Sequence, residues 1–121
     1  MEFYFEIDRP IYIQLVEKLK SYIILGELKP GTRIPSVREF SIKAKVNPNT
    51  MQKALQELEN EGLIYTERTN GKFVTEDVNL IKESKNKLAN EMVINYFDSM
   101  KSIGMTHHEA ISYLQKLGGK I

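Results

Sequence analysis

Cysteine is absent from this chain of 121 residues, and long apolar runs are absent as well. Without cysteine the chain can form neither a disulfide nor a thiolate metal site. No apolar segment approaches the roughly 18 residues that are needed to cross a bilayer. The N-terminal residues Met1 to Glu6 lack the basic start and the apolar stretch of a signal peptide. These absences predict a cytoplasmic protein that has no membrane partner.

Features of a catalytic centre are also scarce. The sequence contains neither a glycine-rich phosphate loop nor clustered carboxylates, and its two histidines, His107 and His108, are adjacent. Neighbouring residues of a helix point about 100° apart, so these two side chains are poorly placed to bind one ion. Thr106 and Glu109 instead give the pattern of a capping box around them. The sequence therefore predicts no enzyme, no cofactor and no metal site.

The net charge is small, but the charged residues are unevenly distributed. The whole chain carries only +1, yet residues 29–53 contain six basic residues and one acidic residue, a local net charge of +5. Residues 54–61 then contain Glu57, Glu59 and Glu61 and no basic residue. Such a basic segment favours contact with phosphates, although a chance cluster on a solvated surface is the alternative.

Two helices are predicted before residue 45. Pro10, with Asp8 as a candidate cap, begins the first, whose apolar positions recur at helical spacing. Ser36 and Glu39 form a capping-box pattern at the start of a second, short helix over about residues 37–44.

A break at Lys45 and Val46 separates this short helix from a third one. Asn47 is the predicted cap of the third helix and Pro48 its first residue. One face of this helix is apolar, and the opposite face is rich in amides that can pair with adenine edges. That outer face contains Asn49, Gln52, Lys53 and Gln56.

A β-hairpin is predicted directly after the third helix. Residues 63–67 and 72–75 are rich in strand-forming side chains, and Asn70–Gly71 between them accepts the positive φ that a tight hairpin needs. Two helices that meet at a sharp corner and are followed by a hairpin form a winged helix-turn-helix. This motif most often binds double-stranded DNA.

The composition changes after about residue 78. An amphipathic helix is predicted over residues 80–103 and a short helix after Thr106, and together they are too short to enclose a core. Their apolar sides must pack either on a second copy of the chain or back onto the first domain. The dimer is favoured because paired DNA half-sites require one. Its predicted contact residues are Leu88, Met92, Tyr96, Phe97, Met100 and Leu114.

The predicted fold is mainly α with a small β-hairpin. A winged helix-turn-helix occupies residues 1–78, and a two-helix C-terminal dimerisation tail occupies residues 79–121. A small-molecule effector could bind between the tail and the first domain, where Tyr96, Phe97 and methionines would lie, but dimer core is the alternative role for these side chains. A winged helix that binds another protein is the alternative function, although the polar outer face lacks the aromatic anchors of such interfaces.

Several motifs, taken in order, resemble those of GntR-family transcription regulators. They are Pro10–Leu15, Gly26–Glu39, Val46–Thr50, Glu61–Ile64 and Gly71–Val74. The short two-helix tail is similar to that of the YtrA subfamily. The resemblance implies a homodimeric bacterial repressor that binds a palindromic DNA operator.

The resemblance also implies which residues contact DNA. Carried over by position, they are Ser36, Arg38, Asn47, Asn49, Thr50, Gln52 and Gly71 with its neighbours. Lys53 on the polar face and Lys72 beside the hairpin turn are further candidates. Arg38 can clamp a phosphate or reach a guanine. Asn47 and Thr50 could instead serve only to start the helix, and Lys72 could only decorate a strand.

Overall fold

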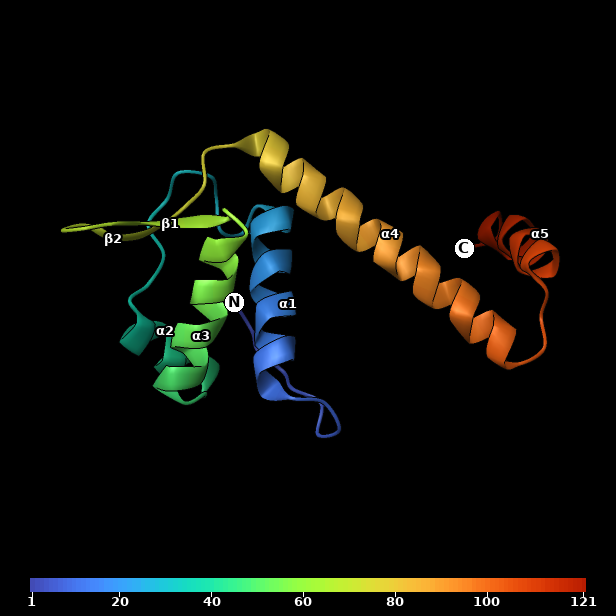
Figure 1. The fold of residues 1–121 in the computed structure, drawn as a ribbon, viewed down its shortest axis with the longest axis horizontal. Helices are drawn as coiled ribbons and strands as arrows, with labels where there is room; N and C mark the ends of the chain where they lie inside the picture. The colour runs from blue at the N-terminus through green and yellow to red at the C-terminus, as the bar shows by residue number, and fades with distance from the viewer. The chain divides into compact units, whose positions relative to one another are not determined.

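The computed structural model describes residues 1–121, which form two compact units, Met1–Ser84 and Lys85–Ile121. Figure 1 shows the elements, which are α1 (Ile11–Leu25), α2 (Val37–Ala44), α3 (Pro48–Asn60), β1 (Ile64–Glu67), β2 (Gly71–Val74), α4 (Val78–Ser102) and α5 (His107–Gly118). The predicted fold class, three helices with a β-hairpin and then two C-terminal helices, is confirmed. The two units divide within α4, after Ser84, whereas the predicted boundary follows residue 78.

Helix α3 forms the centre of the first unit. It packs against α1, α2 and β1. Its apolar face is buried as the helical spacing predicted, through Met51, Ala54, Leu55 and Leu58. These side chains meet buried side chains of the other elements: Leu15, Leu19, Ile23, Phe40, Ala44, Leu63, Ile64 and Val74. This core determines which face of α3 is left for solvent or a partner.

Local side-chain caps define where α2 and α3 begin. Ser36 Oγ accepts a hydrogen bond from the Glu39 backbone N–H at 3.2 Å. The Glu39 carboxylate accepts from the Ser36 hydroxyl at 3.1 Å and not from the Ser36 backbone, so only half of the predicted capping box forms. Asn47 Oδ1 accepts from the Asn49 N–H at 2.8 Å, and the predicted cap of α3 is confirmed. Between the two helices, Lys45 adopts the left-handed region at φ 57° and makes the corner.

The N-terminal arm is held by a buried amide of α1. The Gln14 side chain accepts from the Glu6 N–H at 2.7 Å and donates to the carbonyl oxygens of Glu6 and Arg9 at 3.0 and 2.8 Å. The predicted cap by Asp8 is wrong, because α1 begins after Pro10 without a side-chain cap. The backbone of the arm is instead satisfied by a side chain from within the helix.

The hairpin differs from the predicted one in its turn. Glu67 and Gly71 are its last paired residues, so the loop consists of residues 68–70. Gly71 has φ 103°, whereas Asn70 is not in the positive-φ region. The prediction that Asn70 and Gly71 form a tight turn is therefore wrong in detail, because the glycine alone supplies the positive φ for a longer loop.

A short extended segment before α2 pairs with the outer edge of β2. The Ile34 N–H donates to the Lys72 carbonyl at 2.9 Å, and Arg33 lies directly opposite Phe73 in antiparallel register. The sequence did not predict this pairing, because it joins residues that are far apart in the chain.

The helices of the second unit hold each other through few contacts. The Tyr96 hydroxyl donates to the Ala110 carbonyl at 2.7 Å, and the ring of Phe97 stacks on that of His107 with centroids 4.2 Å apart. Ala110 is the only buried residue of α4 and α5, so the unit has almost no core of its own. None of the helices combines the length and the apolar composition that a membrane span requires.

Candidate nucleic-acid interface

The start of α2 and the outer face of α3 carry most of the predicted DNA-binding residues. Arg38 is exposed in the first turn of α2, two residues after the Ser36 cap, and its guanidinium makes no ion pair. On α3 the half-buried Thr50 is accompanied by three exposed side chains, Asn49, Gln52 and Lys53. In the view of Figure 1, α2 and the hairpin tip both lie on the side of α3 away from α1.

The amide side chains of α3 differ in how much of their hydrogen-bonding capacity is free. Asn47 uses Oδ1 to cap the helix and keeps its two amide donors. Asn49 and Gln52 are exposed, and their side chains make no hydrogen bond within the chain. Gln56 donates to Asn60 Oδ1 at 3.0 Å and is therefore engaged within α3. The free amides are thus concentrated at the beginning of α3, where winged helices approach base edges.

The basic residues of segment 29–53 are exposed and unpaired. The four ion pairs of the chain use only Arg9, Lys20 and Lys72 as cations. Two of the three carboxylates that follow this segment are paired inside the first unit: Glu61 binds Lys20 at 2.7 Å and Glu59 binds Lys72 at 3.4 Å. The cations of the segment, none of which forms an ion pair, are Lys29, Arg33, Arg38, Lys43, Lys45 and Lys53. Their positive field is therefore not neutralised by direct pairing.

Lys72 is placed differently from a free cation at the hairpin turn. Its Nζ lies 2.9 Å from Thr66 Oγ1 and 3.4 Å from Glu59 Oε2, and its side chain is only 18% exposed. The Thr66 hydroxyl in turn donates to Glu59 Oε1 at 2.7 Å. Lys72 thus links the hairpin to the end of α3, while the neighbouring Gly71 stays half-buried at the turn.

This network predicts a pH-dependent contribution to stability. The hydrogen bond from Thr66, and then the charge of Lys72, hold the pKa of the Glu59 carboxyl below its usual range. Because the pKa is lower in the folded than in the unfolded state, the contribution is present above the unfolded pKa and is lost as pH falls through the folded pKa. We expect Glu59→Gln to lower the free energy of unfolding by about 1 kcal/mol at neutral pH and by almost nothing in acid.

Urea unfolding from about pH 3 to about pH 7 measures this difference. Glu57→Gln is the matched control, because Glu57 lies on the same helix and its carboxylate makes no ion pair. A loss of stability in Glu59→Gln that is equal at every pH would contradict the assigned linkage.

The predicted dimerisation residues lie on α4 and α5 and differ in exposure. Leu88, Tyr96, Phe97 and Met100 are half-buried. Met92 and Leu114 remain 68% and 47% exposed. They are accompanied by other exposed apolar side chains on the tail: Val93, Ile94, Ile103, Ile111, Tyr113, Leu117 and Ile121. An apolar surface of this extent is typical of an interaction site.

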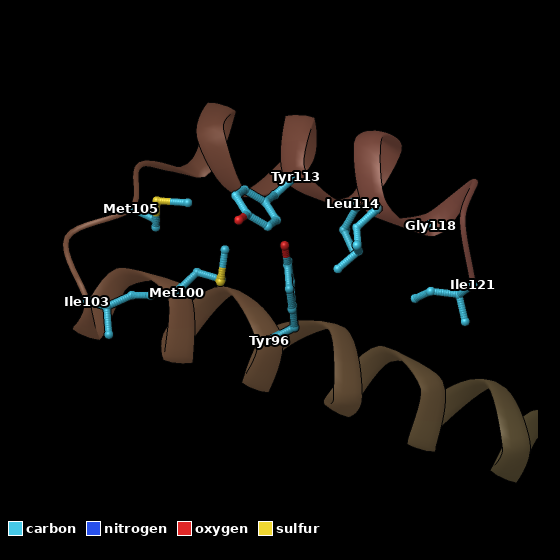
Figure 2. A pocket seen from close by; sticks show the side chains of 9 residues that line it. Tyr96, Met100, Ile103, Met105, Tyr113, Leu114, Gly118 and Ile121 are labelled. Atoms are coloured by element: carbon cyan, nitrogen blue, oxygen red, sulfur yellow. The ribbon is translucent and has the colours of Figure 1, made fainter.

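An apolar pocket of about 390 Å³ lies between α4 and α5. Figure 2 shows Tyr96 and Met100 of α4 facing Tyr113 and Leu114 of α5 across it. Phe97 does not line this pocket, since its ring stacks on His107. Most of the side chains predicted to line an effector site between the tail and the first domain therefore line a pocket within the tail.

The two histidines lie in the first turn of α5, next to its helix cap. Nowhere in the chain are three or more histidine, aspartate or glutamate side chains grouped closely enough to hold a metal ion. The Glu109 N–H donates to Thr106 Oγ1 at 3.1 Å, and the Thr106 N–H donates to Glu109 Oε1 at 3.0 Å. The predicted capping box of α5 is confirmed, and its hydrogen bond from the Thr106 backbone lowers the pKa of Glu109.

Residues 11–74 match the family model of the bacterial regulatory proteins of the gntR family. The chain belongs to the GntR family. The matched residues run from the start of α1 to the end of β2 and include every predicted DNA-binding residue. The chain is therefore a DNA-binding transcription regulator of the GntR family and not an enzyme.

Similarity to individual GntR relatives extends into the tail. The chain is 37% identical to the uncharacterized HTH-type transcriptional regulator YhcF of Bacillus subtilis (strain 168), over 92% of each chain. It is 35% identical to the HTH-type transcriptional repressor YtrA of the same strain, over 89% of this chain and 78% of YtrA. These relatives support the predicted place in a YtrA-like group of the GntR family.

Solved structures give the same fold. A GntR family transcriptional regulator from Listeria monocytogenes superposes with a TM-score of 0.83 at 36% identity, covering 93% of this chain and 98% of that chain. The DNA-binding domain of AraR in complex with operator ORX1 has a TM-score of 0.55 at 28% identity, covering 62% of this chain and 95% of that chain. The GntR winged helix-turn-helix is thus the fold of the first unit.

Sequence reasoning missed one feature of this GntR surface, the position of Arg33 beside the hairpin. The only signal for it in the sequence is that the apolar Ile34 follows the polar Arg33, an alternation typical of an edge strand. A pattern this short does not identify its pairing partner.

Proposed function

We propose that this chain is a homodimeric repressor that binds a two-fold symmetric DNA operator through α2, α3 and the hairpin. The observation that carries the proposal is the unpaired basic surface of residues 29–53 beside the free amides of Asn49 and Gln52. Cations bind phosphates, and amides bind base edges. The names of two relatives support it, since YtrA is a repressor and the AraR domain was solved with an operator.

Each group of residues has a separate role in the proposed complex. Arg38 clamps a backbone phosphate or a guanine edge from the first turn of α2. Ser36 and Thr50 lie at helix starts, where free backbone N–H groups add phosphate contacts. Gly71 allows the hairpin turn to approach the DNA backbone closely. The residues proposed to face the major groove are Asn47, Asn49, Gln52 and Lys53.

The tail is proposed to join two copies of the chain. Its helices bury only Ala110 and leave Met92 and Leu114 largely exposed, so a second copy would remove much apolar surface from water. An isologous contact would also impose two-fold symmetry on the DNA-binding units. Two units related in this way match two half-sites of one operator.

The affinity for operator DNA is expected to decrease steeply with salt. Each phosphate contact releases condensed counterions, and several cations per copy should give a log–log slope steeper than about −4. Fluorescence anisotropy on a labelled duplex, measured at a series of salt concentrations, gives this slope. A flat plot would argue against phosphate contacts and in favour of a protein partner for this surface.

A further inference from the structure

The two faces of the hairpin have different surroundings. Side chains alternate along a strand, and the register pairs Ile64 with Val74 and Thr66 with Lys72 on one face. Ile64 and Val74 are buried, so this inner face is turned toward the core and α3. The outer face contains Tyr65, Glu67, Gly71 and Phe73.

The Lys72 side chain lies on the inner face of the hairpin and is bound there. Its ammonium is held by Thr66 and by Glu59 of α3 at 2.9 and 3.4 Å. A phosphate contact outside the hairpin would require Lys72 to leave both partners. Lys72, the cation beside the hairpin turn, is therefore engaged within the first unit and is not free at the surface.

Arg33 places a cation on the outer face. Because Arg33 is directly opposite Phe73 in antiparallel register, its side chain shares the face of Phe73, whose ring stacks on Tyr65. A Cβ atom added to Gly71 would lie 3.0 Å from Arg33 Nε and 3.4 Å from Nη2. The guanidinium thus lies over the bare α-carbon of Gly71, at the hairpin turn.

This guanidinium is available for a ligand. Arg33 is exposed and makes no ion pair. Glu67, the acidic residue among the paired positions of the outer face, accepts a hydrogen bond from Asn70 Nδ2 at 3.0 Å and makes no ion pair with Arg33. The loop itself adds the exposed cation of Arg68. The outer side of the turn therefore presents two exposed cations, Arg33 and Arg68, beside the single carboxylate of Glu67.

We propose that Arg33 is the cation through which the β1–β2 hairpin, the wing of the winged helix, binds DNA. Lys72 serves only to hold this wing on α3. Arg33 donates its planar fork to a backbone phosphate beside the Gly71 turn. The proposal rests on the DNA-binding function proposed above and assigns one of its contacts. Since a phosphate contact carries no sequence information, Arg33 contributes affinity equally to different operators.

Three charge-removing variants test the proposal: Arg33→Gln, Lys72→Gln and Lys82→Gln as a control on the exposed first part of α4. Operator affinity is measured by anisotropy across salt concentrations, and folding is measured by thermal unfolding. We expect Arg33→Gln to weaken binding by at least roughly tenfold, at an unchanged melting temperature. Its salt slope should become shallower by about 0.9 for each phosphate that Arg33 no longer neutralises, or about 2 per dimer.

The other variants separate a contact from a structural role. Lys72→Gln should lower the melting temperature and leave the salt slope unchanged, and Lys82→Gln should change neither. Arg33→Lys should keep most of the slope, because it keeps the charge. An Arg33→Gln slope equal to that of Lys82→Gln, or a loss of thermal stability without a change in slope, would overturn the assignment.

These measurements distinguish the role of Arg33 from the DNA-binding function as a whole. Wild-type protein that binds DNA with a steep salt dependence, together with an unaffected Arg33→Gln variant, removes only the role of Arg33. A shallower salt slope of DNA affinity in Lys72→Gln at an unchanged melting temperature would show that Lys72, and not Arg33, makes the phosphate contact of the wing. Wild-type protein that binds no duplex would remove both proposals.

Discussion

Arg38→Ala is expected to weaken operator binding by more than about tenfold and to leave the melting temperature unchanged. The guanidinium is exposed in the first turn of α2 and has no ionic partner within the chain, so its removal costs no internal contact. In the complex, the same removal deletes a bidentate, charge-assisted contact with a phosphate or a guanine. Gel-shift or anisotropy titration of both proteins measures the difference.

Lys82→Ala is the control for this experiment, because it removes one exposed positive charge of the same unit outside segment 29–53. An equal loss of affinity in both variants would show that only net charge matters. An unchanged affinity of correctly folded Arg38→Ala would remove Arg38 from the interface.

Leu114→Asp is expected to convert the protein to a monomer and to reduce operator affinity by at least about 100-fold. Leu114 faces the apolar pocket between α4 and α5 and is 47% exposed, so the new carboxylate would be buried without a partner in a dimer. A monomer loses the gain of about 10²–10⁴ that comes from binding two half-sites at once. Sedimentation velocity gives the oligomeric state, and anisotropy gives the affinity.

Gln115→Asp is the matched control for the tail, since Gln115 is exposed on the neighbouring position of α5 and does not line the pocket. It introduces the same charge and should leave both the mass and the affinity unchanged. A Leu114→Asp protein that remains dimeric would place the interface elsewhere. A monomeric wild type with high operator affinity would contradict the dimer itself.

The parts of the fold that follow from local chemistry could be predicted from the sequence. Asn47 followed by a proline marked the start of α3, and the structure has this cap. The apolar spacing from Met51 to Leu58 identified the buried face of α3 and therefore its polar outer face. Both signals depend on residues within one or two helical turns, which is why the sequence alone was sufficient.

The features that could not be predicted from the sequence depend on contacts between residues that are far apart in the chain. The side of the hairpin on which Lys72 lies depends on strand register and on Glu59 of α3. Arg33 reaches the wing only because its segment pairs with β2. Gln14 holds the N-terminal arm through Glu6 and Arg9, which precede its own helix. No local pattern encodes these three outcomes.

Two copies of this chain are proposed to bind one operator through α2, α3 and the β-hairpin. Selection of bound duplexes from a random DNA library by the full-length protein, followed by sequencing, tests it most directly. We expect enrichment of a two-fold symmetric site with two half-sites about one helical turn apart, or a small multiple of it. Absence of any enriched sequence, or enrichment of a single half-site, would contradict it.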